Sequence, residues 1–173
     1  MGIWGLPPAR FLVLSAACPI MGRYSTSVRT TGRAVMAGAD RTVITSNQAP
    51  QPLGAYSLGI SVSFGKLVFI AGQVGVDSNG NLVGKGDAAA QTRQALENIG
   101  HVLAAAGAGF SDVVEFTTYV VGRSSIRGYL DGRGQVYPDI YPDGEFPTNT
   151  LSVVAGLVNE DLLVEIKAVA ALP

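Results

Sequence analysis

FPTNTLSVVAGLVNEDLLVEIKAVA, residues 146–170, is the stretch of the sequence that decides the fold. It predicts two strands, because aliphatic and β-branched residues cluster on either side of the polar turn Asn159–Asp161. Side chains alternate across a strand, so Glu165 falls on one face of the second strand and Val164 and Ile166 on the other. The aliphatic face belongs in a core. The face with the carboxylate fits either the solvated side of a half-buried strand or a functional site.

The composition of the chain is apolar for a protein of its size. Its 173 residues suffice to bury a core; 47% are hydrophobic and 14% charged, which indicates that some surface is covered by another subunit. The net charge of −1 and the pI of about 5.7 argue against a nucleic-acid partner. One cysteine, Cys18, and one histidine, His101, are too few for an internal disulfide or a zinc site, so no metal is expected.

Residues 1–40 are expected to be a disordered leader, followed by a single domain over residues 41–173. The leader has no acidic residue before Asp40, and its apolar run, residues 11–20, is too short to span a bilayer. It fits an organellar transit peptide, with residues 1–35 directing the chain to mitochondria, a secretory or lipoprotein signal, or an over-long start. The candidate starts are Met1, Met21 and Met36. The simplest interpretation is a cytoplasmic domain with no membrane partner.

Two helices are predicted within the domain. Asp87 is a suitable N-cap for a helix over residues 88–106, which carries one apolar stripe at a spacing of three and four. A second, poorer helix is expected over residues 126–137, where three glycines interrupt it.

The remaining apolar segments predict strands. They lie at residues 41–45, 56–63, 67–71 and 113–121, before the two C-terminal strands. The continuously apolar segment 67–71 is expected to be buried on both faces. Six strands with only two helices predict an α+β fold, in which both helices cover one face of a mixed sheet.

Five short motifs of the domain carry a family resemblance: Leu53-Gly54-Ala55-Tyr56, Ile70-Ala71-Gly72-Gln73, Gln91–Ile99, Pro147-Thr148 and Val164-Glu165-Ile166. Together they resemble the motifs of the RidA/YjgF family of reactive-intermediate deaminases. The resemblance covers residues 43–172. It implies a chorismate-mutase-like α+β fold with a mixed six-stranded sheet and two helices on one face, a homotrimer, and a small-molecule cleft between subunits.

The resemblance implies cofactor-free hydrolysis of an imine or enamine to a carbonyl compound and ammonia, with Glu165 orienting the water. The positions that correspond to the family's substrate-binding residues are Tyr56, Ala71, Gln73, Gly134, Asn149 and Leu151. Ala71, Gly134 and Leu151 stand where the family usually has serine, asparagine and cysteine. The chain departs from the pattern at Asn149, which replaces the arginine that anchors a substrate carboxylate. An amide has neither the charge nor the fork of a guanidinium, so such a pair loses about 2 to 5 kcal/mol. The chain is therefore expected either to hydrolyse a non-standard substrate or to bind a metabolite without turning it over, as a regulatory trimer.

Arg133 and Arg127 are candidate replacements for the missing cation, although a solvated helix face is the usual place for arginine. A ribonuclease activity, which is reported in the family, agrees poorly with the acidic pI.

Overall fold

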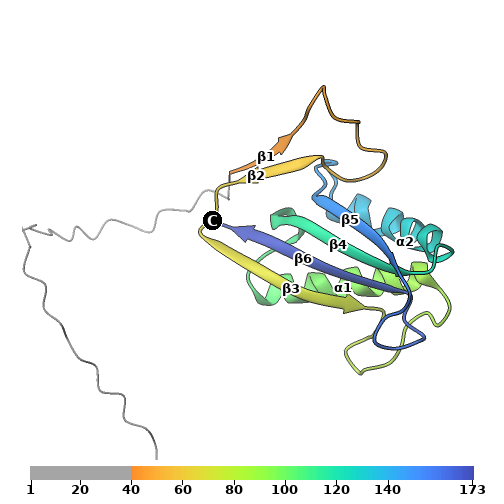
Figure 1. Cartoon of the computed structure of the whole chain (residues 1–173). Helices are drawn as coiled ribbons and strands as arrows, with labels where there is room; N and C mark the ends of the chain where they lie inside the picture. The colour runs from red at the N-terminus through yellow and green to blue at the C-terminus, as the bar shows by residue number, and fades with distance from the viewer. Residues whose placement is uncertain (1–39) are drawn as a thin grey trace, which may run out of the picture. The chain divides into compact units, whose positions relative to one another are not determined.

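The computed structural model describes residues 40–173, so the predicted leader and its targeting role lie outside the described residues. The regular elements are β1 (Arg41–Ile44), β2 (Gly59–Val62), β3 (Lys66–Val74), α1 (Ala88–Ala105), β4 (Val113–Val121), α2 (Ser125–Ile140), β5 (Thr148–Val154) and β6 (Val164–Leu172) (Figure 1). Over the described residues, no helix has the length and apolarity needed to cross a membrane.

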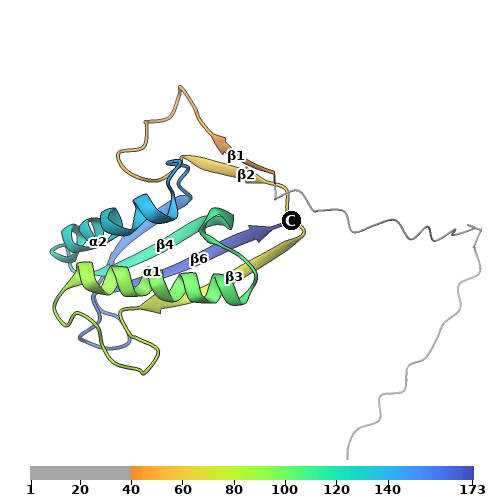
Figure 2. The same ribbon diagram turned by 180° about the vertical axis from the view of Figure 1, so that it is seen from behind.

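Four strands form the main sheet, in the order β3-β6-β4-β5. The β4–β5 pair is parallel and the other two pairs are antiparallel, so the sheet is mixed. Both helices lie on the same face of this sheet, as the front and back views show (Figures 1 and 2). The α+β class with two helices on one face is thus confirmed.

The prediction of one six-stranded sheet is wrong in one respect. All six strands are present, but β1 and β2 form a separate antiparallel ribbon. Side chains rather than a strand ladder join this ribbon to the domain: the Arg41 guanidinium donates to the Glu145 carboxylate at 3.0 Å and to the Phe146 carbonyl at 3.2 Å. The two strands of residues 146–170 are also not partners, because β4 lies between β5 and β6.

Helix α1 begins where the sequence predicts. The Asp87 carboxylate accepts hydrogen bonds from two backbone N–H groups of the first turn, which satisfies donors that have no partner within the helix. The apolar stripe of Thr92, Leu96, Ile99 and Leu103 is buried against the sheet.

Helix α2 is longer than predicted and its glycines do not interrupt it. A Cβ at Gly128 would lie 2.8 Å from the Ala88 Cβ, and one at Gly132 would lie 2.5 Å from the Ala89 carbonyl oxygen. The two glycines therefore allow α2 to pack closely on α1, and this packing outweighs their low helix propensity.

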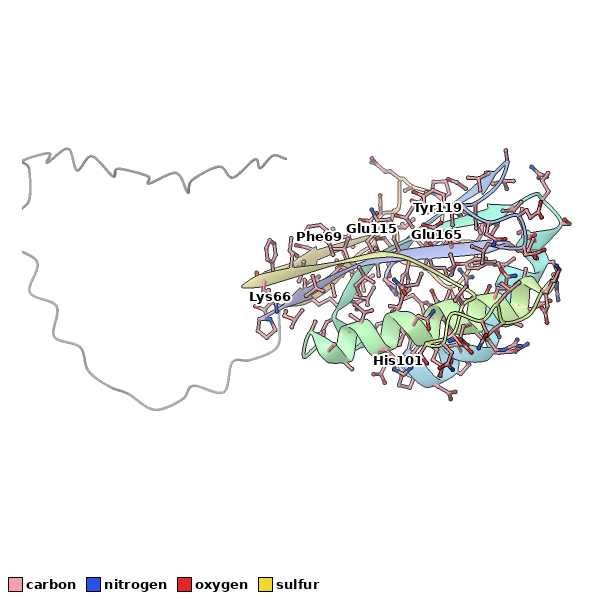
Figure 3. All side chains as sticks on the ribbon, turned by 90° about the horizontal axis from the view of Figure 1, so that it is seen from below. Lys66, Phe69, His101, Glu115, Tyr119 and Glu165 are labelled. Atoms are coloured by element: carbon pink, nitrogen blue, oxygen red, sulfur yellow. The ribbon has the colours of Figure 1, made fainter. Side chains whose placement is uncertain are left out.

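The face of the sheet opposite the helices is open. The prediction that segment 67–71 is buried on both faces is wrong, because Ile70 is 3% exposed whereas its neighbour Phe69 is 73% exposed. Figure 3 shows Phe69, Tyr119 and Glu165 on the side of the sheet away from the helices, and His101 on the helix side. Two helices cover only one face, so the apolar residues of the other remain uncovered in a single chain.

Tyr141 offers a test of the core next to α2. Its ring packs edge-on against Tyr137 and Phe146, and burial raises the pKa of its phenol. Within residues 40–173 its buried hydroxyl has no hydrogen-bond partner. Tyr141→Phe is therefore expected to raise the free energy of unfolding by about 1 kcal/mol, since it removes an unsatisfied polar group. Urea denaturation measures this change. Tyr129→Phe is the matched control and is expected to lower stability, because the Tyr129 hydroxyl is bonded; a destabilised Tyr141→Phe variant would contradict the assignment.

Candidate functional site

A pocket of about 300 Å³ lies between α2, β5 and the segment that precedes β2. Its lining residues are Leu53, Gly54, Tyr56, Leu130, Arg133, Asn149 and Leu151. The structure thus brings together three of the residues predicted from the sequence, Tyr56, Asn149 and Leu151, and we call this the α2 pocket.

Strand β5 supplies the floor of the α2 pocket. Asn149 and Leu151 are two residues apart, so their side chains lie on the same face of the strand. They are in register with Phe116 and Thr118 of β4, which are buried under the helices. The β5 residues therefore face α2, but β5 is an edge strand and leaves them partly exposed.

The Asn149 amide is held by a network of hydrogen bonds. Its Nδ2 donates to the Tyr129 hydroxyl at 2.9 Å, and its Oδ1 accepts from the Thr118 hydroxyl at 3.1 Å. Tyr129 and Thr118 are both buried. Asn149 consequently serves to fix the position of Tyr129, and each of its polar atoms already has a partner within the protein.

Arg133 lies in the α2 pocket, contrary to the expectation of a solvated helix face. Its Cζ is 5.4 Å from the centre of the Tyr129 ring and 5.2 Å from that of Tyr137, within the range of a cation–π interaction. Arg127 is the solvated one: its side chain is 85% exposed and pairs with Asp131 at 3.0 Å. A sequence signal for Arg133 exists, because Tyr129, Arg133 and Tyr137 are spaced by four and so share one face of α2.

The Tyr137 ring beneath Arg133 is a neutral support rather than an anionic partner. Burial, with a smaller contribution from Tyr129, raises the pKa of Tyr137 well above its usual value, and Arg133 lowers it only in part. Tyr137 is thus a neutral phenol at physiological pH, and it leaves the positive charge of Arg133 uncompensated.

The remaining predicted residues lie elsewhere in the chain. Glu165 is on the open face, in register with Tyr119, and its carboxylate occupies the space above Gly72 that a side chain there would fill. Ala71 is exposed on β3. Gln73 lines a separate hollow of about 390 Å³ at the β3 edge, together with Asn98 and His101.

Gly134 does not line the α2 pocket or the hollow at the β3 edge. It is exposed, and its neighbour Arg133 occupies the pocket instead. Over residues 40–173 no three metal-ligating side chains are grouped closely enough to hold an ion. Within one chain, therefore, the predicted residues do not form one site: Tyr56, Asn149 and Leu151 lie in the α2 pocket and Glu165 lies on the open face. Ala71 and Gln73 lie on β3, where Gln73 is in register with the buried Ile166 and faces the hollow beside α1.

Comparison with known proteins gives a consistent result. A family model described as Endoribonuclease L-PSP matches residues 46–172. The 2-iminobutanoate/2-iminopropanoate deaminase of Rattus norvegicus is 35% identical over 136 residues, which cover 78% of this chain and 93% of the relative. The 3-aminoacrylate deaminase RutC of Acinetobacter baylyi is 35% identical over 130 residues, which cover 74% of this chain and 95% of the relative.

The fold has solved counterparts. The crystal structure of the Rid-family protein YyfB of Yersinia pestis is similar, with a TM-score of 0.68 and 36% sequence identity. The match covers 76% of this chain and 98% of that protein.

Proposed function

Because the chain belongs to the RidA/YjgF family, we propose that it hydrolyses a small imine or enamine to a carbonyl compound and ammonia, without a cofactor, on a substrate outside the usual range of the family. The observation that carries this proposal is the α2 pocket, in which Tyr56, Asn149 and Leu151 meet although they are up to 95 positions apart in the sequence. Two relatives with whole-domain similarity are deaminases by name, one of imino acids and one of aminoacrylate.

The reaction requires only a bound substrate and a positioned water. An enamine first takes a proton on carbon to become the protonated imine, which can lose a proton from nitrogen to give the neutral imine. The oxygen of water then adds to the imine carbon, its proton passes to the nitrogen, and the carbinolamine collapses with cleavage of the C–N bond to release ammonia and the carbonyl product. A carboxylate that accepts the proton of water accelerates the addition, and Glu165 is the residue we assign to this step.

We propose that Glu165 reaches the α2 pocket from a second copy of the chain in a homotrimer. Glu165 lies on the open face of the sheet, whereas the pocket lies on the helix side. The open face carries the 73% exposed ring of Phe69 beside Val169, apolar area that a monomer would leave in water. Packing of this face against a neighbour would bury that area and bring Glu165 close to a pocket.

An ammonia assay tests the proposed activity. Imines are generated in place from alanine and 2-aminobutanoate by an amino-acid oxidase, and from simple amines by an amine oxidase, and ammonia release is followed with and without the protein. We expect release above the uncatalysed rate for at least one of these imines. A protein that binds the carbonyl products, yet accelerates none of the reactions, would be a metabolite-binding trimer instead.

A further inference from the structure

In the α2 pocket, strand β5 offers an uncharged amide, Asn149, whereas helix α2 offers a cation, Arg133. We propose that Arg133 is the anion-binding residue of the α2 pocket and that Asn149 is a positioning residue that holds the support on which Arg133 lies. This inference rests on the proposed function for the statement that the bound anion is a substrate carboxylate. Binding of the anion to Arg133 does not itself depend on turnover.

The guanidinium of Arg133 is available to a ligand. The ion pairs within residues 40–173 use other basic side chains, namely Arg41, Lys85, His101 and Arg127. Among the residues that the structure describes, Arg133 makes one hydrogen bond, from Nη1 to the Tyr129 hydroxyl at a long 3.5 Å. Its other N–H groups have no partner in that part of the chain, and the pocket walls around them include Leu53, Leu130 and Leu151.

The surroundings strengthen a bond between Arg133 and an anion. The rings of Tyr129 and Tyr137, 2% and 5% exposed, keep water from one side of the guanidinium. A charged pair that is partly removed from water attracts more strongly than one in bulk solvent. A planar guanidinium also pairs with a carboxylate through two parallel hydrogen bonds, which gives direction as well as affinity.

Asn149 acts on Arg133 through Tyr129. The amide donates to the Tyr129 hydroxyl at 2.9 Å, and Thr118 lies 3.3 Å from the same oxygen. These contacts fix one of the two rings on which the guanidinium rests. The amide at position 149 thus orients a cation that comes from another element, and the two side chains are expected to act as a unit.

An anchor at Arg133 affects substrate specificity, because it holds the substrate carboxylate on the α2 side of the pocket. The reacting carbon of such a substrate is then displaced from where an anchor on β5 would place it. A small imino acid is then hydrolysed only if its reacting carbon still lies next to the attacking water. The pocket can therefore bind a carboxylate and yet prefer a substrate outside the usual range of the family.

Pyruvate, with methyl pyruvate as its uncharged match, is the probe for this inference. In the wild-type protein, labelled with ¹⁵N in arginine, pyruvate is expected to shift the side-chain Nε resonance of Arg133 in NMR titrations, and methyl pyruvate is not. Arg133→Met is expected to weaken pyruvate binding about thirtyfold or more, since one partner of a charged pair is lost, and to leave methyl pyruvate binding unchanged. Arg133→Lys, which keeps the charge without the fork, is expected to fall between them.

Arg127→Met is the matched control, because Arg127 belongs to the same helix but is solvated and paired with Asp131; pyruvate binding should not change.

Asn149→Ala combined with Arg133→Met tests the coupling, and the two effects on pyruvate affinity should be much less than additive. Equal binding of pyruvate by wild type and Arg133→Met, or an unmoved Arg133 resonance in the wild type, would overturn the inference. Loss of pyruvate binding in Arg133→Met alongside no ammonia release in the wild type would instead uphold the inference and reject the proposed activity.

Discussion

Glu165→Gln is expected to lower the rate of ammonia release by about 100-fold or more, the usual contribution of a general base. Glutamine has the same shape as glutamate but cannot accept a proton from water. The carboxylate rests over Gly72, where a Cβ would overlap it, so the backbone of β3 sets its position. The measurement is the initial rate on the best imine of the panel, with unfolding by urea to show that the variant is folded.

Glu115→Gln is the matched control for this experiment. Glu115 is on the same open face, on β4 (Figure 3), but it is exposed. Within residues 40–173 its carboxylate accepts one hydrogen bond, from the Thr117 hydroxyl at 3.4 Å. We expect it to keep the wild-type rate. Equal losses in the two variants would show a general effect of charge on this face rather than a role for Glu165.

Mixed oligomers decide whether Glu165 acts in the pocket of another copy. Leu151→Trp is designed to fill the α2 pocket, and Glu165→Gln removes the base, so each variant alone is expected to be inactive. When the two are unfolded and refolded together, a trimer can join an intact pocket with an intact Glu165 from a neighbour, and activity should return. Folded mixed oligomers without activity would place both groups in the same copy and refute the proposed arrangement.

Gln91→Leu is expected to lower the free energy of unfolding by about 3 kcal/mol or more, because three backbone groups lose their partner away from water. Gln91 is fully buried. Its Nε2 donates to the carbonyls of Gly84 and Asp161, and its Oε1 accepts from the Leu163 N–H at 2.7 Å. One side chain of α1 thus holds the loop before the helix and the turn that leads into β6.

Gln94→Leu on the same helix is the comparison for this measurement. Gln94 is only partly buried, and its side chain bonds to Asn98 alone among the described residues. We expect a change of less than about 1 kcal/mol, the typical net value of a single hydrogen bond. Similar effects of the two substitutions on the urea midpoint would show that the three hydrogen bonds of Gln91 stabilise the fold no more than the single bond of Gln94.

Because Leu163 precedes Glu165 by two residues, the folded fraction of Gln91→Leu is also expected to lose activity.

The sequence by itself determined the class of fold, the presence of the two helices and the faces of the C-terminal strand β6. The alternation around Val164, Glu165 and Ile166 placed Glu165 away from the core, and Asp87 marked the start of α1, as observed. These features depend on repeats of two and of 3.6 residues and on capping, which are local properties of the chain.

Only the tertiary structure decided which strands are neighbours and which residues share the pocket. Alternation along residues 146–170 is the same whether β6 pairs with β5 or, as observed, lies between β3 and β4. Arg127 and Arg133 are six residues apart, about 120° around a helix axis. The spacing by four groups Arg133 with Tyr129 and Tyr137 on one helix face, but it does not tell which segments that face meets. Gly128 and Gly132 decide which arginine faces the pocket, because they allow α1 to approach closely. This contact fixes the rotation of α2 about its axis and directs Arg133 towards Asn149 and Tyr56.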